Sequence, residues 1–206
     1  MKRYIRYILD KLGGRIVSRI DLLQILEKFN EKNKFYYLLK RKYILRIFGG
    51  VYYVRTIEEI LYDTYPSLLK TLSNAMTFFT EKWFFGLYTA LMLNRVTSEY
   101  YRVYYIVNNK LYRPHPIQVL GHKVRIVKFS EKLFGFGIIR ENNLIYSDIE
   151  RTILDLAYWM HYRSEPETLI IRRLRLYTEK IDKNKILSYL NYYPKSLRKI
   201  INAILS

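Results

Sequence analysis

The chain has 206 residues, which is enough for one large domain or two small ones with a buried core. Half of the residues are apolar, which excludes wholesale disorder, and the lack of cysteine excludes disulfides, thiol catalysis and thiolate metal sites. Lysine and arginine number 36 against 18 aspartate and glutamate, so the net charge of +18 favours a polyanionic partner, either nucleic acid or an anionic membrane.

The apolar stretch at residues 83–93 is shorter than the about 20 residues that a transmembrane helix needs. Arg6 and Asp10 interrupt the start of the chain, where a signal peptide would need an apolar core. We therefore expect a cytoplasmic protein with no membrane partner. The 22 tyrosines and only two glutamines are typical of a thermophile, a signal that the eleven asparagines weaken.

Positive charge is concentrated at the start of the chain. Residues 1–55 hold 14 basic and 4 acidic side chains, a net charge of +10, whereas residues 56–206 hold 22 and 14, a net charge of +8. This front segment is the expected contact with a polyanion. The alternative is a generally basic surface without a specific partner.

Three helices are predicted in the front segment. Residues 2–12 have apolar side chains at helical spacing, and Gly13 and Gly14 end the run. Ser18 is a suitable N-cap for a second helix, and a third is expected at about residues 33–42.

A β-hairpin is predicted directly after the third helix. Two β-rich runs, residues 43–48 and 51–55, flank Gly49 and Gly50. Three helices followed by a hairpin predict a winged helix-turn-helix domain at residues 1–55. In that arrangement the third helix enters the major groove of double-stranded DNA.

The predicted DNA-binding surface combines the outer face of the third helix, which carries no acidic residue, with nearby cations. Its residues are Lys32, Asn33, Lys34, Tyr36, Tyr37, Lys40, Arg41, Arg46, Arg19 and Arg15. Lys2 and Arg3 are expected to add phosphate contacts that set register rather than specificity. The alternative is a winged helix that binds another protein, with its lysines merely solvated.

A helical connector is predicted at residues 56–80, opened by a capping box at Thr56–Glu59. Residues 81–206 are predicted to form a mixed α/β domain with a helical C-terminal tail, so the fold class is α+β. Its expected elements are a buried helix at 83–93, extended segments at 103–107, 122–129, 134–139 and 144–146, a capping box at Ser147–Glu150, and helices beginning near Ser164, Lys183 and Pro194.

Part of the chain resembles the AbiEi-type antitoxins, the DNA-binding halves of type IV toxin–antitoxin pairs. The matching features are Trp83, Gly86, Ala90, Leu91, the strands at 103–107 and 124–129, and the segment Asp148–Asp155. That segment reads roughly Asp-Pro-Glu-Arg-Thr-Leu-Leu-Asp in the family, and here Ile149 replaces the proline. The resemblance covers about residues 1–160. In the family, as in this chain, a winged helix precedes the second domain.

The resemblance implies a transcriptional repressor that autoregulates its own operon. It also implies antitoxin activity through the second domain, with a nucleotidyltransferase-like toxin as functional partner, but it does not imply direct binding of that toxin. Apart from the resemblance, repeats that flank the promoter would allow two copies to bind cooperatively. A compact wing and an unusually basic chain depart from the family pattern. A stand-alone regulator that has lost its toxin is therefore the alternative.

The second domain can be compared with nucleotidyltransferases, but the catalytic signature is missing. That chemistry needs a Gly-Ser turn for the triphosphate and two carboxylates on the next strand for divalent metal. Here Gly86 is followed by Leu87, and residues 102–109 contain no aspartate or glutamate. We expect a nucleotidyltransferase-like relic that is not an enzyme and has no catalytic residue, metal or cofactor.

The other candidate sites are interpreted as structural. The best remaining carboxylate group is Asp148, Glu150 and Asp155. Asp148 and Glu150 lie at a predicted helix start, where the helix dipole favours negative charge, and Glu150 with Arg151 is expected to serve as cap and ion pair rather than as catalyst. The three histidines, His115, His122 and His161, lack ligand spacing with a carboxylate, and Gly135–Gly137 is expected to be a bend rather than a phosphate loop.

A basic cluster in the tail contains Arg172, Arg173 and Arg175. It fits a second phosphate contact or a solvated face equally well. Two alternatives to the repressor also stay open: a non-specific nucleic-acid-binding protein that stacks tyrosine and arginine on bases, and a non-catalytic protein-interaction module.

Overall fold

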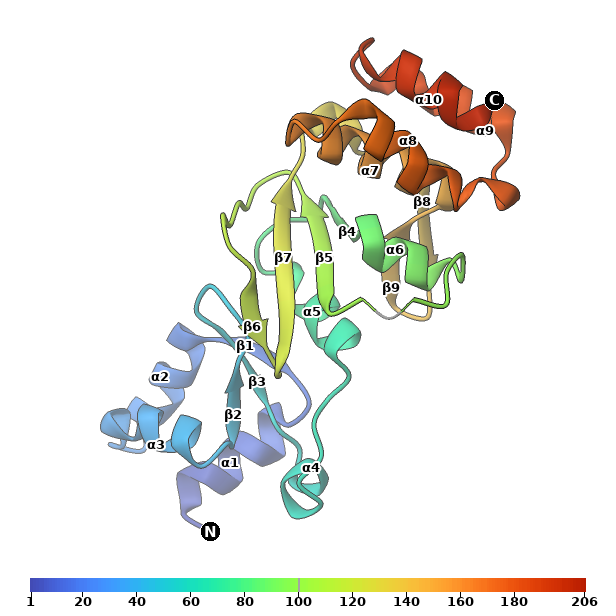
Figure 1. Cartoon of the computed structure of the whole chain (residues 1–206). Coiled ribbons are helices and arrows are strands. Elements are labelled where there is room, and N and C mark those ends of the chain that lie inside the picture. Colours follow the sequence, from blue (N-terminus) through green and yellow to red (C-terminus); the bar gives the residue numbers. More distant parts are fainter. Residues whose placement is uncertain (100) are drawn as a thin grey trace. The chain divides into compact units, whose positions relative to one another are not determined.

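The computed structural model describes residues 1–99 and 101–206, and these residues form a mixed α+β fold with two sheets (Figure 1). This confirms the predicted α+β class. Contacts divide the chain into two compact units. The first unit is Met1–Glu81 with Ile117–His122, and the second unit is Lys82–Pro116 with Lys123–Ser206. The predicted boundaries at 55 and 80 stay a prediction.

The first unit opens with three helices and a small antiparallel sheet. The helices are α1 (Arg3–Leu12), α2 (Arg19–Lys28) and α3 (Phe35–Lys40), the last preceded by a 3-10 turn at Lys32–Lys34. The strands are β1 (Ile16–Ser18), β2 (Ile44–Arg46) and β3 (Val51–Val54), in the order β1-β3-β2.

Local sequence signals set where these elements begin and turn. The Ser18 hydroxyl accepts a hydrogen bond from the Asp21 N–H at 3.1 Å, and the Asp21 carboxylate accepts one from the Ser18 N–H at 3.2 Å. This reciprocal cap starts α2. Between β2 and β3, Gly49 and Gly50 have φ angles of +56° and +79°, and a Cβ at Gly49 would lie 2.7 Å from the Phe79 ring. The turn therefore requires glycine.

The predicted connector contains two helices, α4 (Ile57–Leu61) and α5 (Leu68–Met76), and both belong to the first unit. The capping box that opens α4 is confirmed, because Thr56 and Glu59 exchange hydrogen bonds of 3.0 and 3.1 Å. Phe79, just after α5, stacks on Phe48 with ring centroids 5.0 Å apart. This stacking fastens the connector to the hairpin.

The larger sheet has the order β6-β7-β5-β4-β9-β8. Its strands are β4 (Trp83–Phe85), β5 (Val103–Asn108), β6 (Ile117–Val119), β7 (His122–Lys128), β8 (Ile138–Glu141) and β9 (Leu144–Ser147). β5 runs parallel to β7 and β4 runs parallel to β9, whereas the β4–β5 and β8–β9 pairs are antiparallel. The sheet is therefore mixed.

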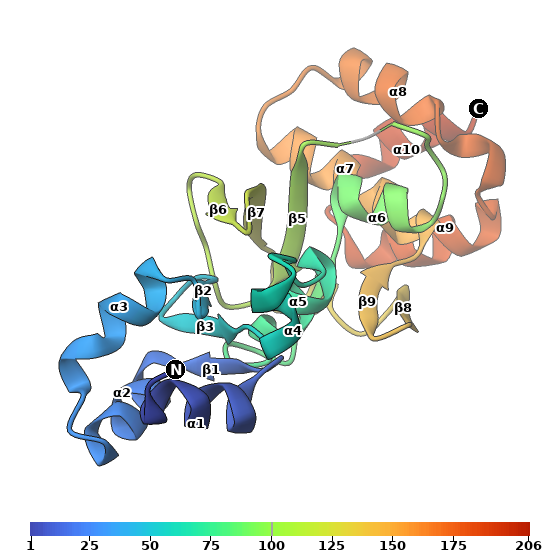
Figure 2. The same cartoon turned by 90° about the horizontal axis from the view of Figure 1, so that it is seen from below.

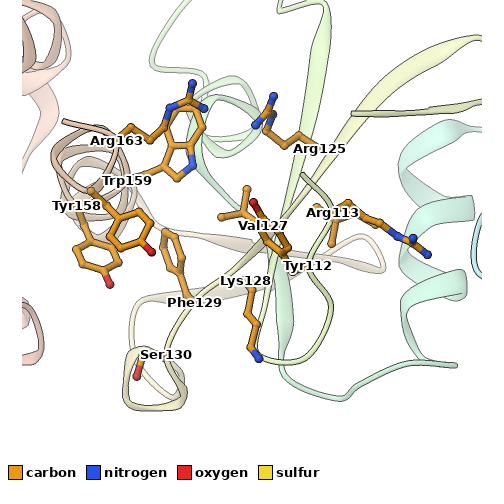
Figure 3. A pocket seen from close by; sticks show the side chains of 12 residues that line it. Tyr112, Arg113, Arg125, Val127, Lys128, Phe129, Ser130, Tyr158, Trp159 and Arg163 are labelled. Carbon is orange, nitrogen blue, oxygen red and sulfur yellow. The ribbon is translucent and has the colours of Figure 1, made fainter. Parts of the chain in front are cut away.

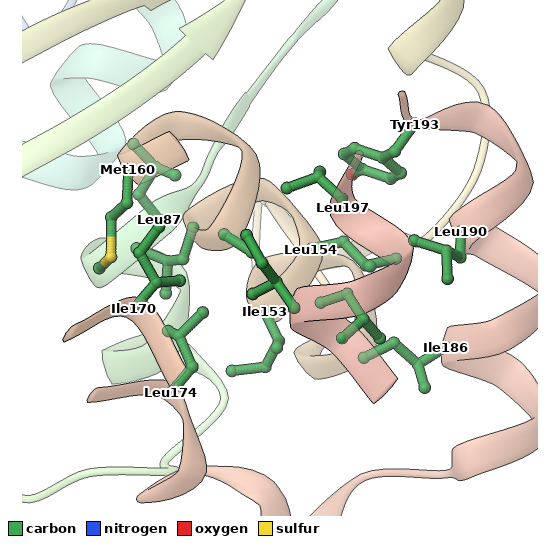
Figure 4. Packing of buried hydrophobic residues seen from close by; sticks show 14 of the residues in the cluster. Leu87, Ile153, Leu154, Met160, Ile170, Leu174, Ile186, Leu190, Tyr193 and Leu197 are labelled. Carbon is green, nitrogen blue, oxygen red and sulfur yellow. The ribbon is translucent and has the colours of Figure 1, made fainter. Parts of the chain in front are cut away.

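Helices pack around α7 (Ile149–Tyr162), the best-buried helix of the second unit. They are α6 (Leu87–Leu93), α8 (Glu167–Arg175), α9 (Lys183–Tyr189) and α10 (Leu197–Leu205). α6 and α7 lie side by side (Figure 2). Ile153 and Leu154 of α7 lie between Ile170 of α8 and Ile186 of α9, and all four are fully buried (Figure 4). Burial of these side chains holds the helices together.

Two predicted elements differ from the structure. Trp83–Phe85 is a strand rather than the start of a helix, because Phe84 pairs with Val107 of β5, and α6 begins only after Gly86. An apolar run this short fits a buried strand or a buried helix equally well, and tertiary pairing decides between them. The extended segment predicted at 134–139 is regular only from Ile138.

Candidate nucleic-acid interface

Helix α3 presents much of the predicted DNA-binding face to solvent. Asn33, Lys40 and Arg41 are exposed, and Tyr36 is 69% exposed. Phe35 and Leu38 point to the core and leave less than 5% of their surface exposed. The helix therefore separates a buried apolar face from an exposed polar face.

Three elements converge at the Phe35 ring. Its centroid lies 5.2 Å from the ring of Tyr52 in β3 and 5.7 Å from that of Tyr36, both edge to face. The Arg19 guanidinium, from the first residue of α2, lies 5.3 Å above the same ring. Arg46 of β2 is the cross-strand partner of Tyr52. Arg19 and Tyr36 thus lie around one buried ring, and Arg46 neighbours Tyr52, a ring that packs on it.

Arg15 lies outside this group. Its carbonyl accepts a hydrogen bond from Val54 at 2.9 Å, whereas the Arg19 N–H donates to the Gly50 carbonyl at 2.8 Å. These contacts lie four residues apart along β3, which corresponds to roughly 13 Å of strand. Arg15 therefore lies well away from Arg19 along the strand and is not among the residues packed on Phe35.

Tyr37 was expected on the outer face with Tyr36, and this is wrong. Tyr37 is half-buried, with its ring 6.5 Å from that of Tyr43 and the Arg41 guanidinium 5.9 Å above it. Lys34 is half-buried as well. The chain after α3 folds back on this side of the helix, which the periodicity alone does not reveal.

An acidic residue reaches the predicted face from α2. Lys32 Nζ lies 3.1 Å from Glu27 Oε1, with both side chains more than 60% exposed. Such an exposed pair contributes little to stability and leaves Lys32 available to other anions. In the part of the chain that the structure describes, Arg19, Lys40, Arg41 and Arg46 form no ion pair, so their charge is free to act on a ligand.

Arg55, the last cation of the basic front segment, is structural. It is 3% exposed, and its guanidinium donates to the carbonyls of Lys42, Glu59 and Thr64 and lies 3.3 Å from the Asp63 carboxylate. These contacts fix the main chain around α4. It is not part of a binding surface.

The segment Asp148–Asp155, which carries the antitoxin resemblance, is also structural. The helix cap lies one residue later than predicted: the Asp148 carboxylate accepts from the Arg151 N–H at 2.8 Å. Glu150 therefore does not cap α7. It is 4% exposed and binds α9, with its oxygens 2.9 Å from Lys185 Nζ and 3.1 Å from the Asp182 nitrogen.

Arg151 pairs with Asp155 rather than with Glu150, at 3.3 Å and with neither side chain exposed to solvent. The Arg151 guanidinium also donates to the carbonyls of Leu133 and Phe136, and the Tyr193 hydroxyl donates to Asp155 at 2.5 Å. Burial raises the pKa of the Asp155 carboxyl, and the adjacent guanidinium opposes that shift. The network joins α7 to the segment before β8.

Two of the three tail arginines contact other residues of the protein. Arg173 pairs with Glu165 at 2.8 Å, and Arg175 donates to the Ala203 carbonyl at 2.6 Å near the end of α10. Arg172 is exposed. Arg173 and Arg175 thus each have a partner within the protein, and a phosphate contact by this cluster stays a prediction.

The second unit contains a cavity that was not predicted from the sequence, lined by aromatic and basic residues at the end of α7 and along β7. A usable signal was present: Tyr158, Trp159, Tyr162 and Arg163 recur at helical spacing. Among the residues that the structure describes, no group of three His, Asp or Glu side chains is placed to bind a metal ion.

No protein-family model matches the chain, and no curated protein is similar to it. Its fold is similar to that of the Rv2827c protein from Mycobacterium tuberculosis, known from a crystal structure, with a TM-score of 0.62. The two chains are 11% identical, and the match covers 98% of this chain and 75% of that one. At this identity the similarity is one of fold alone. No described helix is long and apolar enough to cross a membrane.

Proposed function

We propose that the first unit is a winged helix-turn-helix that binds double-stranded DNA, with α3 as recognition helix and the β2–β3 hairpin as wing. The observation that carries this proposal is the packing of Arg19 and Tyr36 on Phe35, beside the exposed face of α3, with Arg46 on the strand next to Tyr52. An α-helix with an adjacent basic hairpin fits the major groove and the neighbouring phosphates.

Each exposed residue has a distinct role in this proposal. Asn33 offers an amide that can pair with the edge of adenine, and Lys40, about two turns along, can reach a base or a phosphate. Arg19 and Arg46 flank the helix and neutralise phosphates, which sets register rather than sequence preference. Arg15, farther along the strand, is proposed to add a phosphate contact as well.

We further propose that the chain is a sequence-specific repressor of the antitoxin type that autoregulates its operon and counters a nucleotidyltransferase-like toxin. This rests on the resemblance of residues 83–155 to AbiEi-type antitoxins. Because Arg151 and Asp155 are fully buried, a toxin would be contacted through other residues of the second unit. The chain is proposed not to be an enzyme, since β5 carries no carboxylate for a metal-dependent nucleotidyl transfer.

The test is binding of duplex DNA from the gene's own promoter, compared with a scrambled duplex, at two salt concentrations. The double variant Lys40→Glu/Arg46→Glu is expected to lose about 100-fold in affinity and to reduce the salt slope by about two. Lys11→Glu/Lys180→Glu is the matched control, with the same charge change at exposed residues of α1 and of the second unit.

Equal affinity for both duplexes would overturn the sequence-specific repressor and leave a non-specific nucleic-acid-binding protein. Absence of duplex binding at low salt would favour a protein-interaction module instead. An equal loss in both double variants would place the binding surface elsewhere.

A further inference from the structure

The second unit contains a cavity of about 450 Å³ between β7, the segment after β5 and the end of α7. This volume lies within the usual range of small-molecule sites. Aromatic rings and cations dominate the lining, and no Asp or Glu is among the described residues that form it. Such a lining favours an anionic ligand that carries a flat ring.

The rings face each other across the cavity. Figure 3 shows Trp159, Tyr158 and Phe129 on one side and Tyr112 with Val127 on the other. Phe129 and Tyr158 hold each other edge to face at 5.3 Å, so this wall is fixed by packing. Tyr112 is 67% exposed. A planar ligand can therefore enter beside Tyr112 and stack against the wall.

Two arginines provide positive charge at one end of the cavity. Figure 3 places the ends of Arg125 and Arg163 near Trp159, whereas Arg113 and Lys128 extend away from the centre. The Arg163 guanidinium lies 4.6 Å above the Trp159 ring, which orients it without a carboxylate. Neither arginine forms an ion pair within residues 1–99 and 101–206, so both can accept an external anion.

The charges of these arginines act at the same place. Burial raises the pKa of Tyr105, and the positive charges of Arg125 and Arg163 both lower it. The geometry agrees: Arg125 is the cross-strand neighbour of Tyr105, and the Tyr105 ring packs edge to face at 5.7 Å on Trp159, the ring that the Arg163 guanidinium covers. Two converging guanidinium groups suit a phosphate, which offers several acceptor oxygens.

A buried amide positions the segment that carries Tyr112. Asn108, at the end of β5, is fully buried, and its Nδ2 donates to the carbonyls of Leu111 at 3.0 Å and Val127 at 3.1 Å. Its Oδ1 accepts from the N–H groups of Lys110 at 2.9 Å and Leu111 at 2.5 Å. The turn before Tyr112 is thus tied to β7, which makes the cavity pre-formed.

We propose that this cavity binds a nucleotide, with the base stacked between Tyr112 and the opposite rings and the phosphate held by Arg125 and Arg163. Base stacking on aromatic side chains with arginine on the phosphate is the usual chemistry of unpaired nucleotide recognition. The nucleotide can be a free mononucleotide or one residue of a single strand. The proposal concerns the second unit and does not depend on duplex binding by the first.

The test measures binding of AMP, UMP and a fluorescein-labelled six-nucleotide uridine strand at low salt, by calorimetry and anisotropy. Tyr112→Ala and Arg163→Gln change exposed side chains, and each is expected to weaken binding about 10-fold. The matched controls are Tyr62→Ala, at a tyrosine that is 78% exposed in the first unit, and Arg172→Gln on α8. Thermal melting of each variant verifies that it is folded.

Comparing the mononucleotides with the uridine strand shows whether the ligand is a free nucleotide or part of a single strand. Mononucleotide binding lost in both cavity variants supports a free nucleotide, and strand binding at least about 10-fold tighter with the same losses supports an unpaired nucleotide. The proposal is overturned if neither ligand binds at millimolar concentration, or if the cavity variants bind like the controls. It is also overturned if inorganic phosphate competes as well as AMP, because the rings would then play no part. Lys40→Glu/Arg46→Glu is expected to leave this binding unchanged, which separates it from duplex binding.

Discussion

Both units bury an arginine, but they stabilise its charge in different ways. In the first unit, Arg55 is held mainly by main-chain carbonyls, and its carboxylate partner Asp63 is 78% exposed. In the second unit, Arg151 pairs with the fully buried Asp155 and lies 4.1 Å from the Phe84 ring centroid. Arg55 therefore binds main-chain oxygens and one exposed carboxylate, whereas Arg151 lies in the core with a buried carboxylate and an aromatic ring.

The contrast indicates when a carboxylate partner contributes strongly to the stability of a buried arginine. A buried guanidinium can rely on several carbonyl oxygens, and an additional carboxylate at the surface is screened by water. A guanidinium and a carboxylate that are both desolvated depend on each other, because removing one leaves an uncompensated buried charge. Substitutions at Asp155, Tyr193 and Asp63 test this distinction.

The largest effect is expected for Asp155→Asn. The substitution leaves Arg151 buried without its counter-charge, so the free energy of unfolding of the second unit should fall by about 3–5 kcal/mol. Urea titration followed by tryptophan fluorescence measures it, because both tryptophans, Trp83 and Trp159, belong to the second unit.

The double variant Arg151→Met/Asp155→Leu is the matched control. It removes both charges and keeps apolar volume, so it should recover much of the stability that Asp155→Asn loses. A loss below about 1 kcal/mol for Asp155→Asn would contradict the interdependence of the buried pair.

A smaller effect, about 2 kcal/mol at neutral pH, is expected for Tyr193→Phe, which removes the hydroxyl that donates to Asp155 at 2.5 Å. The effect should also depend on pH. Burial, followed by the charge of Asp155, raises the pKa of Tyr193 well above its usual 10.0. The folded protein therefore keeps the proton, and this contribution to stability is present below pH 10 and lost as the pH rises above it.

The pH dependence is measured by urea titration between pH 8 and pH 11. Above pH 10, Tyr193 should contribute a loss of about 1.4 kcal/mol per pH unit, and Tyr193→Phe should remove that share of the slope. Identical slopes in the variant and the parent protein would show that Tyr193 ionises as easily in the folded protein as in the unfolded one.

Elements with local signals were predictable from the sequence, and those that depend on distant partners were not. The caps at Ser18 and Thr56 are set by residues three positions apart. The strand β1 was missed because it has three residues and pairs with β3, more than 30 residues later. Trp83–Phe85 was misassigned for the same reason, since its pairing with β5 is not visible in its own composition.

The same distinction applies to the candidate sites: residues on one helix were predictable, and a site assembled from distant segments was not. The exposed positions of α3 can be predicted from the helical spacing of its own residues. The half-burial of Tyr37 depends on the chain that follows the helix, which is why it was missed. The cavity of the second unit joins residues 112–113, 125–130 and 158–163 through the parallel pairing of β5 with β7 and the position of α7. Spacing along one segment cannot predict such an assembly.

The smallest effect is expected for Asp63→Asn, the same substitution as Asp155→Asn at the partner of the other buried arginine. Because Asp63 is exposed and Arg55 retains three carbonyl acceptors, the loss should stay below about 1 kcal/mol. Hydrogen exchange of the β3 amides measures it, since neither tryptophan lies in the first unit. Asp10→Asn, which removes an exposed pair with Arg6 on α1, is the matched control and should give a similarly small change. If Asp63→Asn destabilised the first unit as much as Asp155→Asn destabilises the second, the exposed carboxylate would be essential to burying Arg55, and the carbonyl oxygens would not be sufficient to stabilise its charge.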